Sequence, residues 1–333
     1  MFSLDGPLAS LGTPSEVLPD SEQRKENRIL LGIDDDDCRL AWTLRLDDSD
    51  SANFQIADFK VSDSKTRERT VDVNQPLWRA SLPSAIKRSL DRLERLICIT
   101  PVRLGVPEIF PSPVHPDPVG DVGLKGEYAP YWLARCSDDV VAAERRHPTE
   151  PASTLRRQLN AWAGELFPGA DINAAVVSRT SFVRLELRTG IKGDYRQPAN
   201  MGFGLTYAVP ILIALLLALP GQVIVIDSPE AHLHPRAQSA MGRILAKIAA
   251  AGVQIFVETH SDHILNGVRL AIRNGDVAPS DATVHFFGWA SDEIGRPGRV
   301  TTPTFASDGS VSNWPDGFFD QAENDQAVLA GWT

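Results

Sequence analysis

The sequence has few cysteines, no long hydrophobic run and no excess of positive charge. Its 333 residues include three cysteines, Cys38, Cys98 and Cys136, which lie far apart and show no CxxC spacing. This pattern argues against a disulfide framework or a zinc site and indicates the reduced thiols of an intracellular protein. The longest apolar stretch, residues 211–219, is far shorter than the ~20 residues that a membrane-spanning helix needs.

The sequence also shows no signal peptide, because its first residues carry neither a basic flank nor a long apolar run. We therefore expect a cytoplasmic protein that does not associate with a membrane. The 33 basic and 43 acidic residues give a net charge of −10. This balance argues against a broad nucleic-acid-binding face, although a local basic groove still fits in an acidic protein. The net charge therefore does not support DNA as a partner.

The N-terminal half predicts an antiparallel sheet followed by helices. Three strand-like runs occur early, and residues 34–37 between the first two predict a hairpin turn. Residues 84–97 carry apolar side chains at helical spacing. The Pro/Gly-rich connection 101–126 is of a length that is usually functional or mobile. We expect strands at residues 27–33, 38–46, 54–61, 174–177 and 181–188, and helices at residues 84–97, 127–135, 138–146 and 152–167.

From residue 200 onward, apolar strands alternate with helices. This rhythm predicts a parallel sheet that is covered on both faces. We expect strands at residues 223–227, 253–258 and 283–287, and helices at residues 201–219, 236–251 and 261–274. The residues after 298 predict a small β and loop appendix with a short C-terminal helix. The fold class is therefore α/β, with a parallel sheet flanked by helices, an N-terminal antiparallel β part and a helical insertion.

Polar residues follow two of the predicted strands, at the point where each strand ends. The run QVIVIDSPEAHLHP, residues 222–235, places Asp227 at the carboxyl end of an apolar strand. Open α/β sheets bind ligands at that edge, where a carboxylate holds Mg²⁺ against nucleotide phosphates. The run VQIFVETHSDH places His260 at the end of the next strand, within reach of a terminal phosphate or an attacking water. The alternatives are a capping aspartate and a capping or core histidine.

The histidines allow a second interpretation of the same region. Five of the seven fall between His232 and His285, and imidazole and carboxylate groups together bind transition metals. An HxH pair in a strand-to-helix loop is a weak metal signal by itself, so we rank a metal-dependent hydrolase below a nucleotide site. The candidate ligands are Asp227, Glu230, His232, His234, His260, Asp262 and His263.

A glycine pair precedes the longest apolar helix. The run NMGFGLTYAVPIL, residues 200–212, puts Gly202 and Gly204 just before this helix. Backbone amides at a helix N-terminus bind phosphate, and glycines allow close approach. The alternative is a glycine pair in an ordinary loop before a core helix.

Taken in order, these motifs resemble the ABC-type AAA family ATPases of the RecF, SMC-like and OLD-like group. Residues 200–206 resemble the signature loop, residues 223–227 the Walker B strand, and His260 the switch histidine. PVRLG (101–105) and DVGLKGEYA (121–129) resemble the lid region. NWPDGFFDQ (313–321) resembles the end of a subgroup with a poorly characterised C-terminal extension. The resemblance covers nearly the whole chain.

The resemblance implies ATP and Mg²⁺ as cofactors and assigns roles to individual residues. Asp227 would bind Mg²⁺, Glu230 would be the catalytic base, and His260 would sense the γ-phosphate. It further implies an antiparallel β part of the head at residues 1–83, a lid region at 84–170, a core at 171–290 and an extension at 291–333. The implied nucleotide-binding residues are Asn200, Gly202, Gly204, Asp227, Ser228 and Asp262.

Two departures from the family pattern limit what the resemblance implies. No Gly-x4-Gly-Lys-Ser/Thr run, the P-loop that holds the β and γ phosphates, occurs anywhere in the sequence. A truncated chain, a misassigned start or a partner polypeptide that carries the P-loop would each explain this. Ser228 stands where many relatives have the catalytic glutamate, and a serine cannot polarise the attacking water as a carboxylate can. We therefore expect little or no ATPase activity from the chain alone.

The implied partners follow from the same resemblance. Such ATPases work as head-to-tail dimers, in which the signature loop of one subunit closes on nucleotide held by the other. Relatives often gate a DNA-acting or toxin-like effector in bacterial antiviral defence, and we expect any effector to be a separate protein. A non-catalytic regulatory or scaffold subunit of a larger complex is the alternative from a different functional class.

Overall fold

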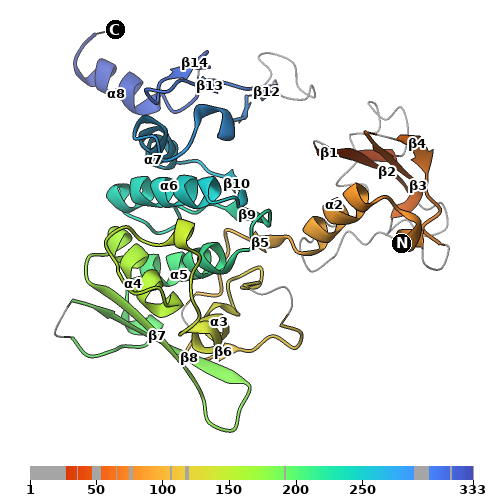
Figure 1. The fold of residues 1–333 in the computed structure, drawn as a ribbon. Coiled ribbons are helices and arrows are strands. Elements are labelled where there is room, and N and C mark those ends of the chain that lie inside the picture. The colour runs from red at the N-terminus through yellow and green to blue at the C-terminus, as the bar shows by residue number, and fades with distance from the viewer. Residues whose placement is uncertain are drawn as a thin grey trace. The chain divides into compact units, whose positions relative to one another are not determined.

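The structure is a computed structural model that describes residues 28–35, 37–46, 54–64, 66–74, 78–105, 107–116, 120–190, 193–288, 300–315 and 317–332. The chain divides into two compact units, Met1–Leu96 and Ile97–Thr333. Figure 1 shows the elements of each unit in chain order. Within the described ranges, no helix has both the length and the apolar character needed to cross a membrane.

Among the residues that the structure describes, the first unit has an antiparallel sheet and one α-helix. Three of its strands confirm the runs expected from the sequence, whereas the fourth was not predicted. One face of the sheet packs on the helix, with Leu40, Phe59, Val61 and Ile86 fully buried between them. The elements, in sheet order, are β1 (Arg28–Asp35), β2 (Cys38–Leu46), β3 (Phe54–Asp63) and β4 (Thr66–Thr70), followed in the chain by α2 (Ser84–Glu94).

The second unit is built on a parallel sheet of three strands in the order β10-β9-β5. These strands are β5 (Ile97–Ile99), β9 (Val223–Asp227) and β10 (Gln254–Glu258). The prediction for β9 is confirmed to the residue. Its unbroken apolar run suits a strand of a parallel sheet that is buried on both faces. The predicted helix 84–97 is shorter than expected, since its last residue, Ile97, belongs to β5.

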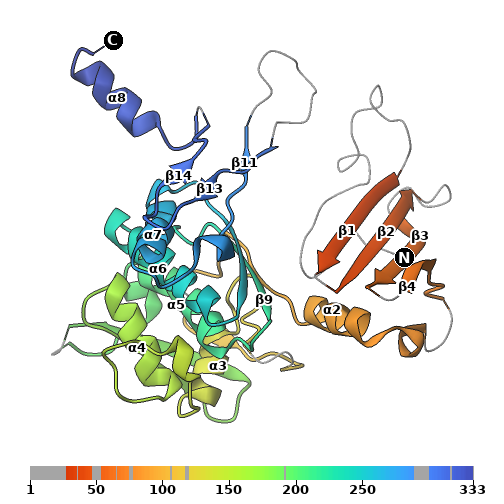
Figure 2. The same ribbon diagram turned by 45° about the horizontal axis from the view of Figure 1, so that its top comes forward.

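Three long helices accompany this sheet. Helix α5 (Phe203–Leu217) is buried almost all round, which explains why its sequence has no polar face. Helices α6 (Pro235–Ala250) and α7 (Asp262–Arg273) pack side by side, as both views show (Figures 1 and 2). These three helices confirm the predicted ones within two residues at each end.

A second, antiparallel sheet has the strand order β6-β8-β7. Its strands are β6 (Phe110–Pro111), β7 (Ala170–Val176) and β8 (Phe182–Thr189), and helices α3 (Ala129–Cys136) and α4 (Leu155–Leu166) pack on it. The predicted helix at residues 138–146 is wrong. Val140 forms a β-bridge with Thr154, and Val141 donates its N–H to the Ser153 carbonyl oxygen at 2.8 Å. Two successive β-branched residues favour this extended backbone over a helix.

The C-terminal part consists of short hairpins and a helix, as the sequence predicted. The strand expected at residues 283–287 is only β11 (Phe286–Phe287), and it pairs antiparallel with β12 (Val300–Thr301) instead of joining the parallel sheet. Arg269 of α7 anchors this part, because its Nε donates to the Gly309 carbonyl oxygen at 2.8 Å. The remaining elements are β13 (Thr304–Phe305), β14 (Val311–Ser312) and α8 (Gln321–Leu329).

The crossing of α6 and α7 depends on two glycines that face each other. A Cβ atom on Gly242 would lie 2.2 Å from the Ile264 carbonyl oxygen, and one on Gly267 would lie 2.3 Å from the Ser239 carbonyl oxygen. Both contacts are to backbone atoms, which cannot rotate away. The two helices therefore pack at a distance that only glycine permits.

We expect Gly242→Ala to destabilise the protein by about 1–3 kcal/mol, because the added methyl group forces the two helices apart. Gly164→Ala is the matched control. Gly164 lies inside α4 with nothing within 4 Å of the added Cβ, so alanine should stabilise the helix by roughly 0.5–1 kcal/mol. Thermal unfolding measures both, and equal melting temperatures for the two variants would contradict the close crossing.

Candidate functional site

Strands β9 and β10 end side by side at one edge of the parallel sheet. Their register pairs Ile226 with Val257 and Asp227 with Glu258. The two loops that follow, which begin at Ser228 and Thr259, therefore leave the sheet at the same place. The structure thus brings together Asp227, Ser228, Glu230 and His260, four of the residues singled out from the sequence.

The loop after β9 has an unusual backbone. Ser228 and His232 both adopt positive φ, at 48° and 61°. Such a conformation costs a non-glycine residue of order 1–3 kcal/mol and persists only where the surroundings enforce it. Ser228 donates its N–H to the Glu258 carbonyl oxygen at 2.9 Å and its hydroxyl to Asp227 Oδ1 at 2.7 Å. These bonds fix Asp227 at the edge of the sheet.

Glu230 links this loop to the one after β10. Its Oε2 accepts a hydrogen bond from Thr259 Oγ1 at 2.7 Å, and its Oε1 accepts one from the His260 backbone N–H at 3.0 Å. Both carboxylate oxygens are therefore engaged in holding the second loop. The expected role of Glu230 as a base competes with this arrangement, because a proton acceptor needs an oxygen that faces the water.

His260 itself is exposed. Its N–H donates to Glu230 Oε1, and the next N–H, on Ser261, donates to Thr259 Oγ1 at 3.1 Å. Ser261 follows as the N-cap of α7, with its Oγ accepting from the Ile264 N–H at 3.2 Å and donating to Gln238 Oε1 at 2.6 Å. The cap explains why the helix begins here. Asp262 lies in the first turn of α7, where its negative charge interacts favourably with the helix dipole and stabilises the helix.

The glycine pair lies where α5 meets the loop after β9. Gly202 is the N-cap of α5 and has open space around it. Gly204 has none, since a Cβ there would lie 2.7 Å from the His232 carbonyl oxygen. The His232 ring contacts Phe203 and Tyr207, at centroid distances of 5.4 and 4.5 Å. Asn200 ends a short 3-10 turn just before this glycine pair.

Arg103 is part of the site, although the sequence marked it only as one residue of the PVRLG run. It is 4% exposed, and its guanidinium donates to the Asp227 carbonyl oxygen at 3.0 Å and to the Ser228 carbonyl oxygen at 3.2 Å. The guanidinium lies 5.6 Å from the centroid of the Tyr207 ring. Burial lowers the pKa of Arg103 to about 10, against the nearby negative charges that raise it. An arginine between apolar residues after a strand was the available signal.

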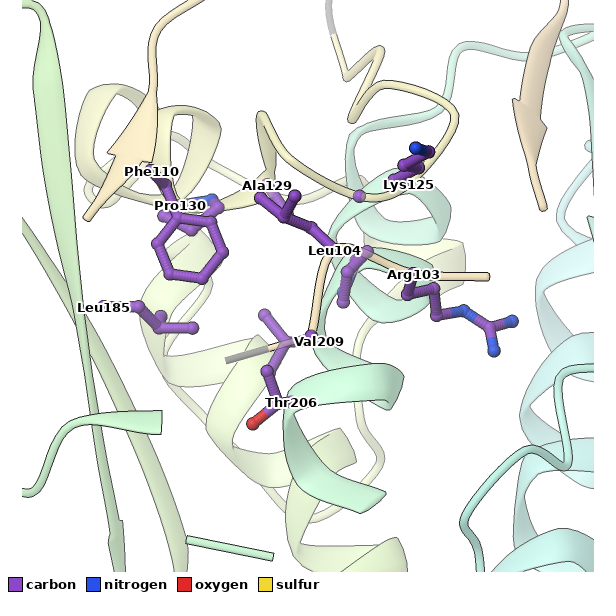
Figure 3. A pocket seen from close by; sticks show the side chains of 12 residues that line it. Arg103, Leu104, Phe110, Lys125, Ala129, Pro130, Leu185, Thr206 and Val209 are labelled. Atoms are coloured by element: carbon purple, nitrogen blue, oxygen red, sulfur yellow. The ribbon is translucent and has the colours of Figure 1, made fainter. Parts of the chain in front are cut away.

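A small cavity lies behind Arg103, between α5 and the antiparallel sheet. Its volume is about 10 Å³, roughly the space of one water molecule. Figure 3 shows Phe110 and Leu185 on its far side and the Arg103 guanidinium directed away from them. A nucleotide does not fit there, so the exposed edge of the parallel sheet is the candidate site.

The histidines do not form a metal centre. No three His, Cys, Asp or Glu side chains gather as ligands within the part of the chain that the structure describes. The His232 ring packs on aromatic rings. His263 Nδ1 lies 3.6 Å from Asp262 Oδ1 at the start of α7. Asp227 remains a carboxylate at a strand end, the kind of oxygen donor that Mg²⁺ takes together with phosphate and water.

Replacing Glu230 by alanine should loosen the loop after β10, because Thr259 Oγ1 and the His260 N–H lose their acceptor. Hydrogen bonds to charged groups contribute about 1.5–3 kcal/mol, so exchange of the His260 amide should accelerate about tenfold or more. Glu258→Ala is the control, since this exposed carboxylate lies one residue before the loop. Amide exchange followed by NMR makes the comparison, and equal protection in both variants would contradict the bridging role.

Comparison with solved structures finds distant similarity to SMC heads. An SMC ATPase described for ATP-driven dimerization and DNA-stimulated activation is 12% identical, with a TM-score of 0.34 over 53% of this chain and 91% of that one. The Pyrococcus furiosus Smc head with the C-terminal domain of ScpA is 12% identical, with a TM-score of 0.32 over 53% and 37%. An SmcHead bound to the C-winged helix domain of ScpA is 10% identical, with a TM-score of 0.41 over 80% and 75%.

Family models give the firmer result. No curated protein matches the chain. Residues 277–329 match a family described as "Protein of unknown function (DUF3696)". Residues 44–266, well over half of the chain, match the family described as "AAA domain, putative AbiEii toxin, Type IV TA system". The chain therefore belongs to this AAA-domain family of ATPase-like proteins.

Proposed function

We propose that this chain supplies one half of a composite ATP and Mg²⁺ site that closes between two head-to-tail partners. The observation that carries the proposal is the convergence of Asp227 and His260 at one edge of the sheet, through the register of β9 and β10. In this proposal Asp227 holds Mg²⁺ and His260 faces the terminal phosphate. Asn200, Gly202 and Gly204, at the start of α5, face nucleotide held by the other partner.

The residues present suit Mg²⁺. Asp227 offers a carboxylate at the strand end, and one of its oxygens already accepts a hydrogen bond from the Ser228 hydroxyl. Mg²⁺ binds proteins through one or two carboxylates and takes its other ligands from water and phosphate. When bound, the ion neutralises charge on the β and γ phosphates.

The exposure of the sheet suggests where the phosphate-binding half would attach. At the β5 edge Ile97 and Ile99 are fully buried, whereas at the β10 edge Phe256 is 53% exposed and Val257 is also exposed. Parallel strands are normally buried on both faces. We propose that the strand bearing the P-loop pairs with β10, which would place its loop beside Asp227 and His260. That strand would come from an upstream segment or from a partner polypeptide.

Two features favour slow hydrolysis and a role in regulation. Ser228 occupies the place of the catalytic glutamate, and both oxygens of Glu230 hold the loop after β10. Nucleotide binding would then serve mainly to close the two partners on each other and to gate a separate effector protein. The toxin–antitoxin description of the family agrees with a role in bacterial defence. The same two features favour the alternative, a non-catalytic scaffold subunit.

Asp227→Ala should weaken Mg²⁺-dependent ATP binding about tenfold or more, because the Mg²⁺ ion loses its carboxylate ligand. A tenfold rise in Kd corresponds to a loss of about 1.4 kcal/mol of binding free energy. Binding of a fluorescent ATP analogue measures this, for the chain alone and together with a candidate P-loop polypeptide. We expect binding only when the P-loop polypeptide is present. Asp281→Ala, an exposed aspartate in a 3-10 turn after α7, should behave as wild type.

Two results would contradict the proposal. Mg²⁺- and ATP-dependent turnover by the 333-residue chain alone, abolished by Asp227→Ala, would show that no second half is needed. Binding and complex activity unchanged in both Asp227→Ala and His260→Ala would favour the scaffold. An in-frame P-loop upstream of Met1 would identify the chain as part of a complete ATPase, and one in a neighbouring gene would identify a split one.

A further inference from the structure

We propose that Arg103 is a positioning residue that sets the Asp227–Ser228 peptide and couples it to helix α5. The proposal rests on the proposed function only in the use that it assigns to Asp227. Three hydrogen bonds of 3.0–3.2 Å run from the two Nη atoms of Arg103 to two successive carbonyl oxygens. One planar guanidinium therefore fixes the direction of both carbonyl groups, which the single ammonium of a lysine cannot do.

The Asp227–Ser228 peptide is held from both sides. Its carbonyl oxygen accepts from Arg103, whereas its N–H, on Ser228, donates to the Glu258 carbonyl oxygen of β10 at 2.9 Å. Ser228 has a positive φ of 48°, a conformation that serine adopts only under constraint. Arg103 contributes to that constraint through its hydrogen bonds to the Asp227 and Ser228 carbonyl oxygens.

The burial of Arg103 is costly, which argues against a role in packing alone. The side chain is 4% exposed, its partners are neutral carbonyl groups, and its Nε has no hydrogen-bond partner among the described residues. Replacing a buried charge by a well-packed apolar residue is often neutral or stabilising. An apolar residue would fill the same space at lower cost, but it would not hold the two carbonyl groups.

Arg103 also links the loop after β9 to helix α5. Its guanidinium lies 5.6 Å from the centroid of the Tyr207 ring, and that ring lies 4.5 Å from the ring of His232. Tyr207 therefore contacts His232 directly and is linked to residues 227 and 228 through Arg103. The run that carries Arg103 is anchored in turn, because the Leu104 N–H donates to the Lys125 carbonyl oxygen at 2.8 Å. A shift of α5 on closure would therefore reach Asp227 through Arg103.

Arg103→Lys in the full chain tests the positioning role, with Arg145→Lys as the matched control. Arg145 is 7% exposed and has an unpartnered Nη1, and burial also lowers its pKa, yet it lies in a 3-10 turn before α4. Hydrogen exchange followed by mass spectrometry measures peptides covering residues 226–232. We expect Arg103→Lys to accelerate exchange there about tenfold, and Arg145→Lys to leave it unchanged. Thermal unfolding checks whether both variants fold.

A second pair of variants keeps the test decisive if Arg103→Lys does not fold. Tyr207→Phe retains the ring beside the guanidinium, whereas Tyr207→Leu removes it. We expect faster exchange over residues 226–232 only in Tyr207→Leu. The same exchange rate in Arg103→Lys and Arg145→Lys, or in both Tyr207 variants, would overturn the positioning role. Exchange in the nucleotide-free chain decides this point, whereas ATP binding with Asp227→Ala separately decides the composite site.

Discussion

The pairing of Asp227 with Glu258 in the parallel strands β9 and β10 is the constraint on which the site depends. A shift of one residue would turn every side chain of a strand to the opposite face. With the present register, the Ser228 N–H reaches β10, and Glu230 reaches the loop that follows it. The glycine crossing of α6 and α7 holds the helices that begin after these loops. Register and helix packing therefore place Asp227 and His260 at the same edge.

Several energetically unfavourable features lie at this edge of the sheet. Two non-glycine residues have positive φ, an arginine is buried among neutral partners, and apolar side chains of β10 are exposed. Each feature costs stability, and the well-packed core around α5 offsets that cost elsewhere in the unit. Backbone strain is often found at functional sites. The common location of these features is independent of the motif resemblance and leads to the same part of the chain.

The sequence predicted the parts of the fold that follow from local pattern. Strand β9 and helix α5 are almost wholly apolar runs, and helices α6 and α7 carry apolar side chains at helical spacing, so their bounds were predictable. Residues 138–146 were expected to be helical, but a tertiary bridge from Val140 to Thr154 decides their backbone. Arg103 and Asp227 are separated by more than a hundred positions in the chain, so no local pattern links them. The same holds for Glu230 and Thr259, whose contact depends on the register of two strands.

The two engaged oxygens of Glu230 join two loops at this edge. The carboxylate accepts from Thr259 and His260, and so it links the loop after β9 to the loop after β10. In the proposed composite site, a shift of His260 toward a phosphate would act on Glu230, and through the loop on Ser228 and the carbonyl groups that Arg103 holds. In that proposal, such coupling suits a site that reports the presence of nucleotide to a partner more than one that hydrolyses it rapidly.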